Sequence, residues 1–149
     1  MRNTPDAGAA APAMSSSHEL ADHVSEIRLR VRAGSLGELL AEAGRALAEI
    51  QLRGAGAVAT GPPREVVITA DDRAALLTDW LNELIYLAEA ERWIGADFEV
   101  NSAVDRRVSA RVRGVRVERA PGLVKAATLH GVRVDEVPGG LEGEVVLDV

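Results

Sequence analysis

The chain has 149 residues, of which 47% are hydrophobic and 27% charged, a length and balance that predict one soluble globular domain. It contains no cysteine, which excludes disulfides, thiol nucleophiles and cysteine-ligated zinc or iron–sulfur sites. The net charge of −6 disfavours general binding to nucleic-acid phosphates, because such binding needs clustered lysine and arginine.

The first segment, Met1–Ser17, is rich in alanine, proline, serine and glycine. A segment with so little to bury cannot offset its ordering entropy, so we expect a disordered tail over residues 1–17 and a single domain over residues 18–149. The tail lacks the apolar region of a secretory signal, and no apolar run approaches the roughly 20 residues needed to cross a bilayer. We therefore expect a cytoplasmic protein with no membrane partner.

Strand and helix patterns follow one another in the first half of the domain. Apolar residues alternate with arginines over Ile27–Val31, which is the period of a strand with one covered face. Ser35 and Glu38 form a capping box, and apolar residues at helical spacing then predict a first helix that ends at Gly54. A loop up to Pro63 and a short strand over Glu65–Thr69 are expected next.

A second helix is predicted from a cap at Asp71 to about Trp93. Its apolar residues form one continuous stripe: Leu76, Leu77, Trp80, Leu81, Leu84, Ile85, Leu87 and Ala88. Its polar residues are expected to face away from that stripe: Asp79, Asn82, Glu83 and Glu89.

The rest of the chain has strand patterns separated by Gly, Pro and Asp turns. The predicted strands are Asp97–Val104, Arg107–Arg113, Val124–His130, Val132–Val137 and Leu141–Val149. Two helices packed on a largely antiparallel β-sheet make an α+β domain.

Arginines share one face of two strands, Arg28, Arg30 and Arg32 on one and Arg107, Arg111 and Arg113 on the other. With few aromatics to stack RNA bases, solvated outer faces are favoured over RNA binding there.

Asp22, His23 and Glu26 lie within five residues, immediately before the first predicted strand. Carboxylate oxygens and an imidazole suit a divalent cation, and an oxygen-rich set favours calcium, magnesium or manganese over zinc. The alternative is that the Asp-His pair is a turn or helix-cap device. These residues are therefore candidate metal ligands that need support from elsewhere in the chain.

Asp148 is an acidic residue among apolar neighbours in the last predicted strand. If this carboxylate is buried, it needs a cation or a metal as partner, and the alternative is that the final two residues fray into solvent.

Lys125 is a candidate to pair with a carboxylate or a phosphate, and its alternative is an ordinary solvated lysine. In a regular strand Lys125 and His130 lie on opposite faces, so they share a site only if a bulge intervenes. His130, before Gly131, is expected in a turn.

Four stretches of the chain, in this order, resemble the archease family across residues 18–149. Leu77–Leu87 is similar to the family's Trp-Leu-Asn-Glu-Leu helix and is the most specific match. The opening Asp-His-Val-Ser-Glu, Asp22–Glu26, is similar to the family's Asp-His-Thr-Ala-Asp and is followed by a similar helix start over Gly34–Leu39. Lys125–Gly131, followed by the terminal Val146–Val149, completes the resemblance.

The opening motif departs from the family at three positions. Val24 stands in place of threonine, Ser25 in place of alanine, and Glu26 in place of the ligand aspartate. The additional methylene of Glu26 moves its carboxylate outward, and the missing threonine hydroxyl removes a hydrogen-bonding group beside the site. We therefore expect a change in metal affinity or preference.

The resemblance implies a metal site formed by Glu26 and Asp148, with Lys125 close by and required for activation. Asp22 and His23 complete the predicted ligands of a calcium, magnesium or manganese ion. The implied partner is the tRNA-splicing RNA ligase, which uses GTP and a divalent metal to join a 3′-phosphate or cyclic-phosphate RNA end to a 5′-hydroxyl. Archease-like proteins promote guanylation of that ligase and its multiple turnover. We therefore expect an accessory activator, not an enzyme, that meets RNA only through the ligase.

Two other classes of function stay open. A small metal-dependent phosphoester hydrolase would use the same acidic residues directly, but the chain has no glycine-rich phosphate loop, nucleophile elbow or general acid–base set. A metal-free binding or chaperone module would recognise partners through the helix surface or a sheet edge. Measurements of divalent-ion binding and of ligase stimulation separate these classes.

Overall fold

The computed structural model describes residues 13–23, 25–55 and 58–149. These residues form two helices and seven strands. Their bounds in chain order are β1 Ser17–His23, β2 Glu26–Ala33, α1 Leu36–Gln51, β3 Thr60–Thr69, α2 Arg73–Glu91, β4 Trp93–Val104, β5 Arg107–Arg116, β6 Ala126–Val137 and β7 Gly140–Asp148.

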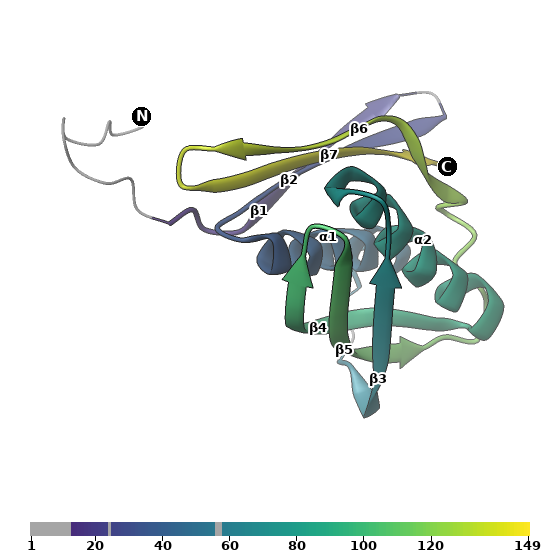
Figure 1. Ribbon diagram of the computed structural model, residues 1–149. Coiled ribbons are helices and arrows are strands. Elements are labelled where there is room, and N and C mark those ends of the chain that lie inside the picture. The colour runs from purple at the N-terminus through teal and green to yellow at the C-terminus, as the bar shows by residue number, and fades with distance from the viewer. Residues whose placement is uncertain (1–12, 24, 56–57) are drawn as a thin grey trace.

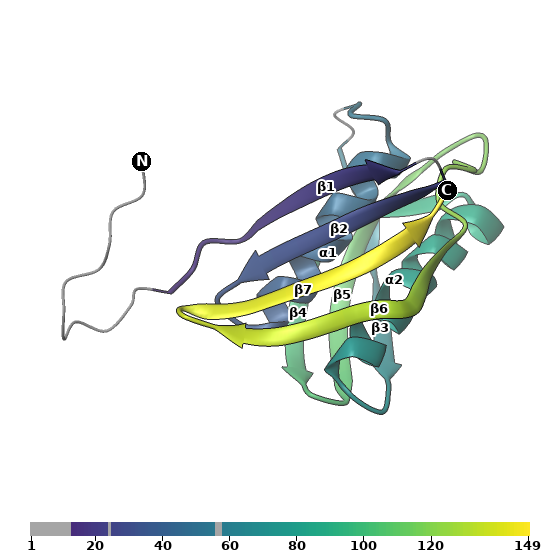
Figure 2. The ribbon, with the colours of Figure 1, turned by 90° about the horizontal axis from the view of Figure 1, so that it is seen from above.

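The strands divide into two antiparallel sheets, and the helices lie between them (Figure 1). One sheet has the order β1-β2-β7-β6, and the other has the order β3-β5-β4. Seen from above in Figure 2, the four strands of the first sheet lie side by side over both helices. The predicted α+β class, with helices packed on antiparallel strands, is confirmed. What the sequence analysis treated as one sheet is two.

The core lies between the layers because both helices bury side chains toward both sheets. α1 contacts β2 and β4, and α2 contacts β6 and β4. Trp80 is fully buried, its indole N–H donates to the Leu40 carbonyl at 2.8 Å, and its ring meets Phe98 edge-on at 6.0 Å between centroids. Burying a large apolar side chain stabilises a fold by roughly 1.5–3 kcal/mol, so this contact between the helices and the second sheet is a main source of cohesion.

The helix caps follow the sequence with one shift. Ser35 caps α1 through its hydroxyl, which accepts from the Glu38 N–H at 3.2 Å. α2 is capped by Asp72, whose carboxylate accepts from the Ala75 N–H at 2.8 Å, so the prediction of Asp71 was wrong by one residue. α2 ends at Glu91 because Arg92 adopts the left-handed conformation with φ of 53°.

Several strands differ from the prediction: β4 begins at Trp93 instead of Asp97, and β5 ends at Arg116 instead of Arg113. β1 was not predicted at all, and β3 begins at Thr60 inside the expected loop. Pro62 and Pro63 are tolerated there because β3 is an edge strand, where a missing N–H breaks no ladder bond on the open side. β6 is one strand with an irregularity between Thr128 and Arg133, where the sequence analysis predicted two strands.

Residues 1–12 of the predicted disordered tail lie outside the described residues. Within the described part of that segment, the Met14 N–H donates to the Gly139 carbonyl at 3.0 Å, and Ser17 is already the first residue of β1. Neither α1 nor α2 combines the length and apolarity that a membrane-spanning helix requires.

Candidate metal centre

The outer face of the first sheet is built by strict alternation along β2 and β7. In β2, Leu29 and Val31 are fully buried, which places Arg30 and Arg32 on the outer face. In β7, Val145 and Leu147 are fully buried, so the residues between them point outward. Side chains directly opposite one another on these two strands therefore meet above the sheet.

Two of these cross-strand pairs join arginine to glutamate. Arg32 lies opposite Glu142 and donates to it at 2.7 Å, and Arg30 lies opposite Glu144 and donates to it at 3.0 Å. Arg133 on β6 adds a second bond to Glu142 at 2.7 Å. These hydrogen bonds from Arg133 and Arg32 lower the pKa of Glu142 below its usual range. On this part of the outer face, the charges of the arginines and glutamates therefore compensate one another.

The pair at the end of the same two strands is different, because Glu26 lies directly opposite Asp148. The Val149 N–H donates to the Ser25 carbonyl at 3.2 Å, just beyond the pair. Glu26 and Asp148 therefore form a non-hydrogen-bonded pair, in which Cα atoms lie about 4.5 Å apart and side chains approach most closely. Among the described residues, no arginine, lysine or histidine forms an ion pair with either carboxylate.

Like charges directly opposite in a sheet are destabilising, and a cation between the carboxylates removes the repulsion. Glu26 is half-buried and Asp148 is exposed at the strand end, so a cation there would keep part of its water shell. Calcium, magnesium and manganese accept such mixed carboxylate and water coordination. The Glu26–Asp148 pair therefore fits an oxygen-preferring divalent cation.

Lys125 lies beside this pair, immediately before β6. Its backbone N–H donates to the Asp148 carbonyl at 2.8 Å, and the next residue, Ala126, lies opposite Asp148 in the sheet. The Lys125 side chain is exposed. Figure 2 shows the start of β2, the end of β7 and the start of β6 together at one end of the sheet. The backbones of Glu26, Lys125 and Asp148 thus lie next to one another at this end of the sheet.

The backbones of the two remaining candidate ligands also reach this region. In the β1–β2 register His23 lies opposite Glu26, and Asp22 lies opposite Ile27. The side chains of Asp22 and His23 lie outside the described part of the structure, so their ligand role stays a prediction. Among the side chains that are described, no three His, Asp or Glu residues are grouped around one metal position.

His130 lies in the irregular part of β6. The segment Leu129–Val132 lies opposite the single residue Val145 of β7, and Gly131 adopts a φ of 75°. The bulge that the sequence analysis required for Lys125 and His130 to share a site is thus present. His130 itself is exposed within the strand.

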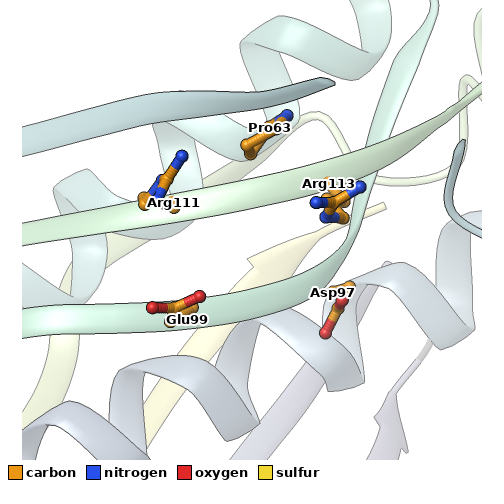
Figure 3. A pocket seen from close by; sticks show the side chains of 5 residues that line it. All are labelled: Pro63, Asp97, Glu99, Arg111 and Arg113. Carbon is orange, nitrogen blue, oxygen red and sulfur yellow. The ribbon is translucent and has the colours of Figure 1, made fainter. Parts of the chain in front are cut away.

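The outer face of the second sheet offers a different kind of surface. A hollow of about 80 Å³ lies on this face. Among its lining residues, Arg111 lies opposite Glu99 and Arg113 lies opposite Asp97 (Figure 3). Glu65 on β3 also lies opposite Arg111. These arginines face carboxylates across the sheet, so the strand is not a free basic patch for RNA phosphates.

Asn82 and Glu89 lie outside the apolar stripe of α2, as predicted, but both are also hydrogen-bonded to other parts of the chain. The Asn82 side chain makes two hydrogen bonds with Ala127, and Glu89 accepts one from the Gly122 N–H. The signal available in the sequence was an asparagine, a poor helix former, inside a strongly apolar helix.

The sequence model of the Archease protein family (MTH1598/TM1083) matches residues 18–149. The chain is 33% identical to protein archease of Methanopyrus kandleri over 86% of this chain and 96% of that protein. It is 31% identical to protein archease of Archaeoglobus fulgidus over the same shares. It is 25% identical to protein archease of Methanosarcina acetivorans over 93% of this chain and 99% of that protein.

Two solved structures share the fold. The solution structure of Methanobacterium thermoautotrophicum protein 1598 superposes with a TM-score of 0.71 at 24% identity, over 89% of this chain and 98% of that one. The crystal structure of "an archease, possible chaperone" from Thermotoga maritima superposes with a TM-score of 0.57 at 21% identity, over 87% and 94%. At these identities the likeness shows the fold alone.

Proposed function

The chain belongs to the archease family, and from that premise we propose that it is an accessory protein that activates the tRNA-splicing RNA ligase. In this role the chain acts in the cytoplasm and promotes the GTP- and metal-dependent guanylation of the ligase and its repeated turnover. It contributes binding and positioning and leaves the chemistry to the ligase. RNA meets the chain only through that partner.

The observation that carries the proposal is the Glu26–Asp148 pair. The neighbouring outward pairs join Arg32 with Glu142 and Arg30 with Glu144, whereas this last pair brings two carboxylates together without an arginine. An arrangement of this kind is destabilising by itself and favourable around a cation. A bound calcium, magnesium or manganese ion would supply positive charge to the phosphate oxygens of GTP in the ligase.

Lys125 has a separate role in the proposal. Its ammonium group carries three donors on a flexible stem, and it starts from a backbone position that is hydrogen-bonded to Asp148. From there the exposed side chain can contact a phosphate or a carboxylate of the partner. The two carboxylates hold the ion, and the lysine orients the group that the ion contacts.

The test is single-turnover guanylation of the ligase from the same organism, measured with GTP and Mn²⁺, with and without this chain. We expect the wild-type chain to accelerate guanylation. The substitutions Asp148→Asn and Lys125→Ala should each reduce this acceleration at least about tenfold. Asp97→Asn is the matched control, because Asp97 is an exposed acid on the other sheet.

Equal guanylation rates with and without the wild-type chain would contradict the proposal. Full stimulation by Asp148→Asn would mean that the chain activates the ligase without an ion at this pair. That result would favour the metal-free binding module. Phosphoester hydrolysis by the chain alone, lost in Asp148→Asn, would favour the hydrolase instead.

A further inference from the structure

The segment that carries Lys125 is fastened to α2 on both sides of the lysine. Before it, the Gly122 N–H donates to the Glu89 carboxylate at 2.9 Å. After it, the Ala127 N–H donates to the Asn82 Oδ1 at 2.8 Å, and the Asn82 Nδ2 donates to the Ala127 carbonyl at 3.0 Å. Asn82 and Glu89 are seven residues apart, which is two helical turns, so they lie on one side of α2.

Asn82 takes the place of a missing strand. β6 is the edge of its sheet, and the Ala127 N–H and carbonyl point away from β7. A side-chain amide is the group that can satisfy both at once, because it holds a donor and an acceptor in one plane. The position of β6 at Ala127 is therefore set by one side chain of α2 as well as by β7.

Lys125 lies between buried residues in this fastened segment. Val124 is 1% exposed and Ala127 is 5% exposed, whereas Lys125 between them is exposed. The Lys125 backbone is also tied to Asp148 through the 2.8 Å bond. A shift of Ala127 would therefore displace the Lys125 backbone relative to the Glu26–Asp148 pair.

We propose that Asn82 is a positioning residue: by clamping Ala127 it fixes where Lys125 stands beside the Glu26–Asp148 pair, and ligase activation depends on that placement. This inference rests on the proposed function. It separates two properties of the chain. Ion binding depends on Glu26 and Asp148, whereas the rate that the bound chain confers on the ligase depends also on Asn82.

Two substitutions examine the clamp. Asn82→Ala removes both hydrogen bonds to Ala127 and exposes two backbone groups to water at a sheet edge. Asn82→Asp keeps the size of the side chain, but an ionised carboxylate only accepts, so it repels the Ala127 carbonyl, while the protonated acid both accepts and donates. Asn101→Ala is the matched control, because Asn101 is an exposed asparagine on β4 of the other sheet.

The experiment titrates each full-length variant into the ligase and measures guanylation with GTP and Mn²⁺. It yields the maximal stimulated rate and the half-saturating concentration of the chain, and calorimetry with Mn²⁺ alone gives ion affinity. We expect Asn82→Ala to lower the maximal rate about tenfold or more, with half-saturation and Mn²⁺ affinity close to wild type. Asn101→Ala behaves as wild type. For Asn82→Asp, the maximal rate relative to wild type rises as the pH is lowered and the acid becomes protonated.

A variant that merely unfolds would raise the half-saturating concentration and leave the maximal rate unchanged, and that result would overturn the positioning role. The role would also be overturned if Asn82→Ala reached the wild-type maximal rate, or if it lost Mn²⁺ binding in the same proportion as stimulation. A wild-type chain without any stimulation would contradict the proposed function itself, so the two failures are distinguishable.

Discussion

At the scale of single residues, the outer face of the first sheet repeats one motif and then breaks it. Arg32 lies opposite Glu142 and Arg30 lies opposite Glu144, so opposite charges face each other at these positions of the two strands. At the end of the same strands, Glu26 and Asp148 place two acids opposite one another. Two facing carboxylates oppose folding unless a cation lies between them, which is the role that the proposed function gives to this pair.

Asp148→Asn tests this repulsion without any ligase. In a chelator the substitution removes one of two facing charges and keeps the size of the side chain, so we expect the free energy of unfolding to rise by about 0.2–1 kcal/mol. Chemical denaturation monitored by circular dichroism measures the change. Asp97→Asn, which separates a carboxylate from Arg113, should not raise stability. A loss of stability in Asp148→Asn would mean that the carboxylates do not repel each other.

Asn82 shows why some site residues escape sequence reasoning. The apolar stripe of α2 was predicted correctly, and eight of its members are buried: Leu76, Leu77, Trp80, Leu81, Leu84, Ile85, Leu87 and Ala88. A helix between two sheets has few sides left for solvent, however, so polar residues outside the stripe also meet protein. Periodicity separates apolar from polar sides but does not reveal a backbone that needs a polar partner.

At the scale of elements, β1 is the strand that the sequence analysis did not predict; it pairs with β2 along its length and is also bonded to α1 through charged side chains. His18 Nδ1 lies 2.6 Å from a Glu42 carboxylate oxygen and His18 Nε2 lies 2.9 Å from a Glu49 carboxylate oxygen, and these two hydrogen bonds connect the edge strand to α1. Arg45 adds a bond to Glu42 at 3.1 Å. The candidate ligands Asp22 and His23 belong to the same strand.

The pH dependence of stability tests the interaction of Glu42 with His18 and Arg45. Burial alone would raise the pKa of Glu42, but hydrogen bonds from His18 and Arg45 outweigh it and leave the pKa below its usual range. Because the folded pKa is lower than the unfolded value of about 4.3, this stabilisation is fully present above that pH. It is lost as the pH falls through the folded pKa.

We therefore expect Glu42→Gln to lower the free energy of unfolding at neutral pH and to flatten its decline in acid. Urea denaturation of wild type and variant over a series of pH values from neutral into acid measures both effects. The variant should retain some acid sensitivity, because Glu142 also has a lowered pKa. Parallel curves for the two proteins would show that Glu42 gains nothing from His18 and Arg45.

A helix or strand could be predicted where the pattern that identifies it lies within a single segment of the sequence. The Ser35 cap, the buried stripe of α2 and the alternation of β2 and β7 are of this kind. Strand partners are not, because a period of two shows which face is covered but not which strand lies alongside. The division into two sheets and the bulge after Thr128 therefore appeared only in the structure.

The site was predicted in the same uneven way. Glu26, Asp148 and Lys125 came from a resemblance to the family, and the structure places their backbones next to one another. Their chemistry stays a prediction, as do the ligand roles of Asp22 and His23. Asn82 could not be placed in advance, because its partner Ala127 is distant in the sequence and its role follows from the fold.

At the scale of the whole molecule, two sheets enclose the helices, and the facing carboxylates of Glu26 and Asp148 lie at one end of the first sheet. The start of β2, the end of β7 and the start of β6 lie together there (Figure 2). A partner that approaches this end meets Glu26, Asp148 and Lys125 together. The acidic net charge of the chain, −6, also favours a cation at this place.

Calorimetric titration of the wild-type chain with Ca²⁺ and with Mn²⁺, beside Glu26→Gln and Asp148→Asn, is the most direct test of this account. We predict that the wild type binds one ion, and that each single substitution weakens the binding by about ten- to a hundredfold, because neither carboxylate is sufficient alone. Ion binding by both variants at wild-type affinity, or no binding by the wild type, would contradict the claim that these two strands hold a metal between them.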